Sequence, residues 1–135
     1  MDNVTRIGIS IEPELLEKFD QMIEQRQYTN RSEAVRDLIR KNLVTDEWEK
    51  GIGTVVGSVT VVYDYDQHNV VDKLAELQHK NHSLIHSASQ VRLDEHTCLE
   101  VIIVQGSPFE IKDFTDKVQA TKGVNHAELA RCTMK

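Results

Sequence analysis

The chain has 135 residues, of which 39% are hydrophobic and 28% charged, and its formal net charge is −6. This length suits one ordinary domain or two small ones, and the composition is typical of a globular protein. No apolar run approaches a membrane span and the first residues lack a signal-peptide pattern, so we expect no membrane association and a cytoplasmic location. Two cysteines, Cys98 and Cys132, are too few for a disulfide framework.

The first regular element is predicted at Arg6 to Ile11, where isoleucine occupies every second position. In a strand this alternation sends the isoleucines to one face, and Arg6, Gly8 and Ser10 to the other. A lone strand has two unpaired edges, so the pattern predicts pairing with the same strand of a second copy.

Two amphipathic helices are predicted next. The first begins at Pro13, a residue favoured in the first helical turn, and the second begins after Asn30, with Glu33 placed to complete a reciprocal cap. Two copies of this strand-helix-helix unit would form a two-stranded antiparallel ribbon over four helices. Such a ribbon can enter the major groove of DNA with its polar face down.

This arrangement assigns the candidate DNA contacts. Arg6 and Ser10 would read base edges, with Gly8 allowing a close approach. The start of the second helix, at Asn30, Arg31 and Ser32, suits a backbone phosphate. The net negative charge argues mildly against nucleic acid, although basic residues gather around the second helix. For that helix alone, a solvated face of mixed charge is the alternative interpretation.

The remaining chain predicts a second domain. Residues 1–47 form the first domain, 48–53 a glycine-containing linker, and 54–135 a βαββαβ unit of the ferredoxin-like type, so the fold class is α+β. Trp48 is expected to be a packing anchor. Valine-rich strands with both helices on one face leave the other face of the sheet open, and we expect another subunit to cover it.

Three stretches carry a family resemblance: the segment from Tyr28 to Asp37, the segment Thr97-Cys98-Leu99-Glu100, and Lys122-Gly123-Val124. They resemble the nickel-responsive regulator (NikR) family, ribbon-helix-helix regulators with a C-terminal ACT-type domain. The resemblance covers almost the whole chain. It implies a sequence-specific DNA-binding transcriptional regulator, expected to be a repressor and a homotetramer built as a dimer of dimers. No arrangement of residues in the sequence supports catalysis.

The same resemblance implies a nickel site from which this chain departs. In the family, one helix histidine, two strand histidines and a cysteine surround the metal, and these positions fall on His79, Gln90, Arg92 and Cys98. Glutamine is a poor ligand and arginine has no lone pair to donate, so tight square-planar nickel is not expected. Weak nickel binding, another metal at His79 and Cys98, a small metabolite, or no effector remain alternatives, as does a separate site at His79, His82 and His86.

Two further hypotheses concern charge. The Arg92 guanidinium could take the place of the metal cation near Cys98 and Glu100 and hydrogen-bond across the subunit interface, or Arg92 could be an ordinary exposed residue. The resemblance also implies an alkali or alkaline-earth ion held by Glu33 and Asp37, with backbone oxygens near Gln119, Thr121 and Val124. Two rival classes remain open: an ACT-type ligand-binding module whose N-terminal part only dimerises, and an antitoxin.

Overall fold

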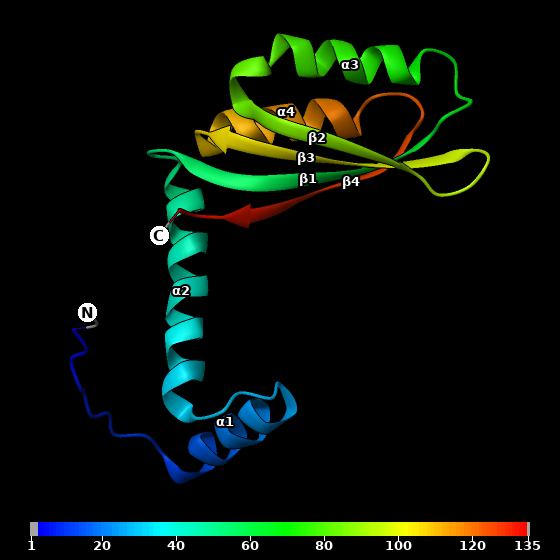
Figure 1. Ribbon diagram of the computed structural model, residues 1–135. Coiled ribbons are helices and arrows are strands. Elements are labelled where there is room, and N and C mark those ends of the chain that lie inside the picture. Colours follow the sequence, from blue (N-terminus) through cyan, green and yellow to red (C-terminus); the bar gives the residue numbers. More distant parts are fainter. Residues whose placement is uncertain (1–2, 135) are drawn as a thin grey trace. The chain divides into compact units, whose positions relative to one another are not determined.

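The computed structural model describes residues 3–134 (Figure 1), and the chain divides between Lys41 and Asn42 into two compact units. The first unit contains helix α1 (Pro13–Gln25) and the beginning of helix α2 (Arg31–Lys50). The second unit contains the end of α2 and a four-stranded sheet with two helices. The α+β class is therefore confirmed, while the boundaries 1–47 and 54–135 stay predictions.

The first unit is a helical hairpin preceded by an irregular segment. Pro13 opens α1, and the apolar side of the hairpin buries Ile23 and Ala34 where the helices meet. Residues 3–12 form no regular secondary structure, so the strand predicted from Arg6 to Ile11 is not present in the single chain. A strand exists only with a hydrogen-bonded neighbour, and the prediction assigned that neighbour to a second copy.

The start of α2 is capped as the sequence indicated. The Oδ1 atom of Asn30 accepts a hydrogen bond of 2.9 Å from the amide of Glu33. This bond satisfies one of the amides that lack a partner in the first turn of any helix.

Replacing this cap tests its contribution. Asn30→Ala is expected to lower the free energy of unfolding by about 1 kcal/mol, because the Glu33 amide loses its acceptor. Urea denaturation of the intact protein measures the change. Thr29→Ala, one residue outside the cap, is the control, and an equal loss in both variants would contradict the capping role.

Helix α2 continues through Lys50, into the stretch predicted as a linker. Two contacts explain the extra turn. Trp48 is buried and its Nε1 donates a 2.9 Å hydrogen bond to the carbonyl of Cys132, while Lys50 forms an i,i+4 ion pair of 2.9 Å with Asp46. Trp48 is thus the packing anchor that was predicted, and residues 48–50 are helical.

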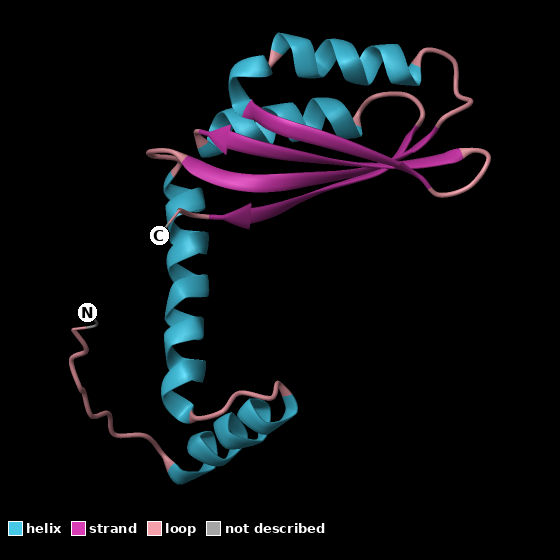
Figure 2. Cartoon of the chain, in the orientation of Figure 1, coloured by secondary structure: helices cyan, strands magenta, loops and turns pink. Residues whose placement is uncertain are grey.

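The second unit has the predicted βαββαβ order (Figure 2). Its strands are β1 (Val55–Asp64), β2 (Ile85–Arg92), β3 (Thr97–Gly106) and β4 (Val124–Cys132), and its helices are α3 (Val70–Lys80) and α4 (Pro108–Gln119). A 3₁₀ turn at His82–Leu84 leads into β2. The strand order is β2-β3-β1-β4 with every pair antiparallel, and both helices cover the same face.

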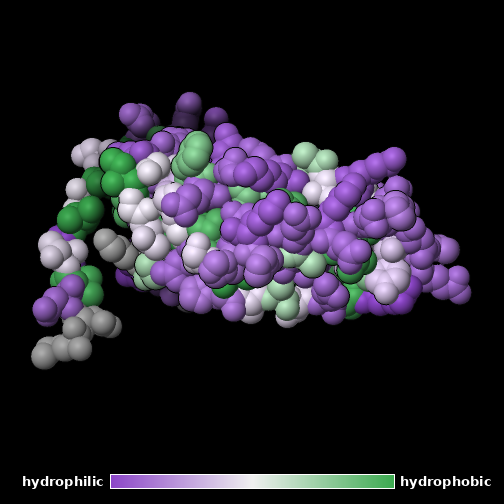
Figure 3. Space-filling model, turned by 90° about the horizontal axis from the view of Figure 1, so that it is seen from above, coloured by the Kyte–Doolittle hydropathy of each residue, from purple (hydrophilic) through white to green (hydrophobic). Residues whose placement is uncertain are grey.

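Alternation along β1 places the core between the sheet and the helices. Val55, Val59, Val61 and Tyr63 are buried, as every second residue of a half-covered strand should be. Phe114 of α4 lies fully buried against them, and the outer surface of the helical layer is mainly hydrophilic (Figure 3). Strand β2 lies at the edge of the sheet, and all its residues after Ile85 are exposed.

Candidate DNA-binding and regulatory sites

The predicted base-reading residues lie in the irregular segment before α1. Arg6, Gly8 and Ser10 are exposed there, as are Ile7 and Ile9, which are 78% and 71% exposed. Exposed isoleucines at alternate positions are costly in water, and pairing with a second copy would bury them. In the single chain the polar residues of this segment are therefore accessible, and its isoleucines are exposed to water.

The predicted phosphate-binding helix end is partly occupied by contacts within the chain. The side chain of Asn30 caps the amide of Glu33, and Arg31 forms a two-pronged ion pair with Asp20 of α1 at 2.8 and 2.9 Å. The hydrogen bonds from Arg31 lower the pKa of the Asp20 carboxyl. Exposed ion pairs of this kind contribute little to stability. Ser32 is exposed at the same helix end.

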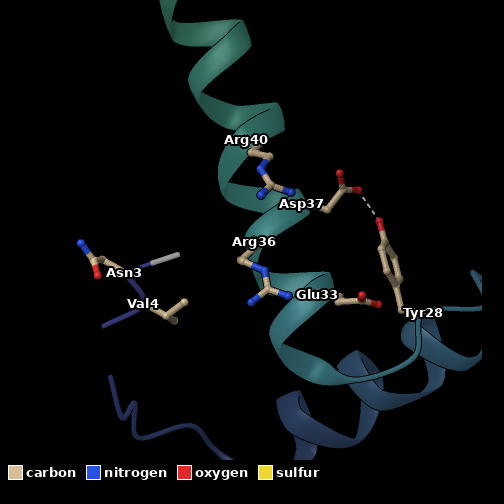
Figure 4. Close-up of a pocket in the computed structure, with 7 residues that line it drawn as sticks. All are labelled: Asn3, Val4, Tyr28, Glu33, Arg36, Asp37 and Arg40. Atoms are coloured by element: carbon tan, nitrogen blue, oxygen red, sulfur yellow. Dashed lines mark hydrogen bonds between the residues drawn. The ribbon is translucent and has the colours of Figure 1, made fainter. Parts of the chain in front are cut away.

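A pocket lies along α2 within the first unit, lined by residues that include Tyr28, Glu33, Arg36, Asp37 and Arg40 (Figure 4). The Tyr28 hydroxyl donates a hydrogen bond to Asp37, and Lys41 pairs with the same carboxylate at 3.3 Å. The bond from Tyr28, followed by that from Lys41, lowers the pKa of Asp37. Asp37 is therefore an ionised oxygen donor that already has partners.

The other positions predicted for the second ion lie in the second unit. Thr121 follows the end of α4, Val124 begins β4, and the amide of Val124 donates to the carbonyl of Thr121 at 3.1 Å. The side-chain oxygen of Gln119 accepts from the amide of Ala127 at 2.9 Å. Glu33 and Asp37 belong to the first unit, so the five positions are contributed by both units.

Three of the four positions matched to the nickel ligands share one face of the sheet. Arg92 lies opposite Cys98 in the β2–β3 register, and Gln90 lies opposite Glu100. Cys98 is buried toward the helices, and residues opposite one another on antiparallel strands point to the same side. His79 is exposed near the end of α3.

Glu100 has a larger part in this site than the sequence analysis gave it. Its side chain is only 2% exposed, and its Oε2 accepts hydrogen bonds from Gln78 at 3.2 Å and from Gln90 at 3.3 Å. Its Oε1 is buried and accepts no hydrogen bond from any residue that the structure describes. A buried acceptor without a partner costs about 1–3 kcal/mol. The signal in the sequence was an acidic residue in an otherwise apolar strand.

Arg92 turns away from Glu100 in the single chain. Its guanidinium carbon lies 4.2 Å from the centre of the Tyr65 ring, and its Nη2 donates a 3.1 Å hydrogen bond to the carbonyl of Glu95. Burial, with smaller contributions from Cys98 and Glu100, raises the pKa of Tyr63 to about 12. The buried side of the site is thus rich in acidic groups, whereas the cation lies outside.

The chemistry of these side chains does not fit the family's four-ligand nickel site. The Gln90 amide is a donor to Glu100, and Arg92 carries a fixed positive charge with no lone pair. No group of three histidine, cysteine, aspartate or glutamate side chains within residues 3–134 of one chain is placed to hold a metal ion. Only His79 and Cys98 keep ligand chemistry among the four positions.

The alternative histidine site is only partly assembled. The rings of His79 and His82 lie 6.3 Å apart, and Nδ1 of His82 is 3.0 Å from the carbonyl of His79. His86 contacts Gln105 instead. The pair therefore lies at one helix end, and the third histidine has a different partner.

A histidine that the sequence analysis did not use forms an ion pair between two loops. His96 contacts the carboxylate of Asp66, and this hydrogen bond raises the pKa of His96 above 6.5. Because the pKa of the folded state is raised, the stabilisation is complete below pH 6.5 and is lost as the pH rises through the raised value.

Asp66→Asn is therefore expected to lower the pKa of His96 toward 6.5, since the charged acceptor is removed. NMR titration of the imidazole measures the shift. Asp113→Asn, which breaks an exposed pair with Lys117 on α4, is the control and should leave His96 unchanged. An unaltered pKa in the Asp66 variant would contradict the assignment.

Similarity to known proteins agrees with this organisation. The ribbon-helix-helix model of the CopG family matches residues 5–46, and the model of the NikR C-terminal nickel-binding domain matches residues 56–132. The fold and sites thus define a two-part ribbon-helix-helix regulator.

The chain belongs to the nickel-responsive regulator (NikR) family. It is 50% identical over 133 residues to a protein of Geobacter metallireducens named nickel-responsive regulator, covering 98% of this chain and 96% of that protein. A protein of Thermococcus onnurineus with the same name is 47% identical over 130 residues, with coverage of 96% and 94%.

One solved structure supports the fold of the second unit. An uncharacterized protein from Thermotoga maritima superposes with a TM-score of 0.54 at 15% identity, covering 62% of this chain and all of that one. Within the described residues, no helix has both the length and the apolar character needed to cross a membrane.

Proposed function

We propose that this protein represses transcription as a homotetramer that binds operator DNA through paired N-terminal ribbons, and that it does not hold nickel in the family's four-ligand site. The near-full-length similarity to nickel-responsive regulators carries the DNA-binding part of this proposal. The replacement of two ligand positions by Gln90 and Arg92 carries the part that concerns nickel.

Several observations support a ribbon formed by two copies. Ile7 and Ile9 are exposed in the single chain, and Leu15, Ile39 and Leu43 of the helical hairpin are more than half exposed. A second copy would bury these residues and would turn Arg6 and Ser10 toward a major groove. A two-fold pair of such ribbons in a tetramer would place two operator contacts on one molecule.

In this proposal the base contacts and phosphate contacts differ in role. Arg6 can donate two hydrogen bonds to guanine, and Ser10 can donate or accept one. Arg31 and Ser32, at the start of α2, would contact phosphates after Arg31 releases Asp20. The phosphate contacts set position, whereas the ribbon sets sequence preference.

Nickel remains the family's effector, and the relatives bear its name. In this chain, His79 and Cys98 could bind nickel or another metal weakly. Glu33 and Asp37, with oxygens near Gln119, Thr121 and Val124, are the positions that we propose for a second, hard cation of the alkali or alkaline-earth type. The ionised Asp37 carboxylate supports that part of the proposal.

The competing function is a ligand-binding module whose N-terminal unit only dimerises. Fluorescence anisotropy separates the two functions, with the intact protein titrated into a duplex from its own upstream region. We expect specific binding to exceed binding to a scrambled duplex by about 10³-fold or more at physiological salt. Equal affinity for both duplexes would contradict the proposal and favour the module.

A further inference from the structure

The carboxylate of Glu100 is a buried charged group in the second unit. It lies in β3 under the helices, with 2% of its side chain exposed. The side-chain amides of Gln78 in α3 and Gln90 in β2 both donate hydrogen bonds to Oε2. Oε1 is buried and accepts no hydrogen bond from residues 3–134, so this oxygen lacks a donor.

The strand register identifies a donor of the right chemistry. Gln90 is opposite Glu100 and Arg92 is opposite Cys98, so Arg92 is the diagonal neighbour of Glu100 on the same face of the sheet. Diagonal neighbours lie about 7–8 Å apart, a span that a long side chain can cross. A guanidinium can offer two parallel N–H donors to a carboxylate.

The present contacts of Arg92 are ones that it can leave. The guanidinium carbon of Arg92 lies 4.2 Å from the centre of the exposed Tyr65 ring, and its Nη2 donates a 3.1 Å hydrogen bond to the carbonyl of Glu95. Arg92 itself is exposed. Cation–π contacts at exposed sites are weak, whereas a charge-assisted bond to a buried carboxylate is among the stronger hydrogen bonds.

We propose that the Arg92 guanidinium moves from the Tyr65 ring to pair with Oε1 of Glu100, and that it serves there as a permanent positive charge in the second unit. The pair links β2 to β3 beside Cys98, and it supplies the positive charge that an effector metal would otherwise bring. This inference rests on the proposed function, because it explains how the regulator orders this region without four metal ligands.

A double-mutant cycle on the intact protein tests the pairing without DNA. The variants are Arg92→Gln, Glu100→Gln and their combination, and the measurement is the unfolding equilibrium constant in urea with a chelator present. We expect a coupling of about fivefold or more between Arg92 and Glu100. A parallel double-mutant cycle of Arg92→Gln with Tyr65→Leu measures the coupling between Arg92 and the Tyr65 ring, the contact seen in the single chain.

Coupling to Tyr65 alone, with none to Glu100, would overturn the proposal. Should Glu100→Gln fail to fold, a crystal structure of the natural protein decides instead. A guanidinium nitrogen within hydrogen-bond distance of Oε1 in the same chain supports the pair, and a guanidinium that stays on the Tyr65 ring overturns it.

The effect of Arg92 on DNA binding is measured separately. In chelator, Arg92→Gln is expected to weaken binding to the upstream duplex by a factor between about 5 and 150, and Arg92→Lys should keep part of the affinity because it keeps the charge. Unchanged binding in both variants would overturn that role. If the natural protein binds no duplex specifically, the proposed function fails, while the cycle still judges the pair.

Discussion

The Gln90→His/Arg92→His double variant is expected to bind nickel at least about 100-fold more tightly than the natural chain. Changes to residues that merely support metal ligands alter affinity by about 10- to 100-fold, and here two ligands are restored. The register places both positions on the face that carries Cys98, so both new imidazoles would point to the side of the thiol. Removing Arg92 also removes a fixed positive charge that repels the ion.

A matched control adds the same two residues to the opposite face. Ser87→His/Ser89→His introduces histidines at the same spacing on β2, but these positions lie opposite Ile103 and Val101 rather than Cys98. Isothermal titration calorimetry of all three proteins measures the affinities. Nickel binding by the natural chain that equals that of the Gln90/Arg92 variant would show that other residues replace the missing ligands.

Arg6→Ala is expected to weaken specific DNA binding by about 100-fold. A bidentate contact from arginine to guanine contributes about 1–3 kcal/mol, and a paired ribbon contains Arg6 twice. The substitution should leave folding unchanged, because Arg6 is exposed and lies outside the helices. Fluorescence anisotropy at one fixed salt concentration measures the change, since affinity for DNA depends steeply on salt.

The control for Arg6 is Lys112→Ala, which removes one positive charge from an exposed position on α4. This variant should lose little specific affinity. A similar loss in both variants would mean that charge alone explains the effect, and would contradict base reading by Arg6.

Periodicity in the sequence was sufficient to predict most of the fold. Alternating valines in β1 and helical spacing in α1, α3 and α4 led to the correct elements, because burial of one face imposes those periods. The linker was predicted at residues 48–53, and helix α2 continues into this stretch as far as Lys50. The contact that extends it joins Trp48 to Cys132, and no local pattern can reveal a partner so distant in sequence.

The candidate sites were predictable in residue type but not in contacts. The Asn30–Glu33 cap followed from local sequence, and the structure confirms the half in which Asn30 accepts a hydrogen bond from the amide of Glu33. The pairing of Arg31 with Asp20, and of Arg92 with Tyr65, depends on how separate elements pack. The strand from Arg6 to Ile11 stays a prediction, since a second copy of the chain would have to supply its hydrogen-bond partner.

The most direct test of the central claim is DNA binding by the intact protein with and without nickel, alongside a calorimetric nickel titration. We predict specific binding to the upstream duplex in chelator, no tight stoichiometric nickel binding, and an affinity for DNA that nickel leaves unchanged. Tight stoichiometric nickel that raises the affinity for DNA would contradict this account, and would show that the chain has kept a nickel-dependent switch.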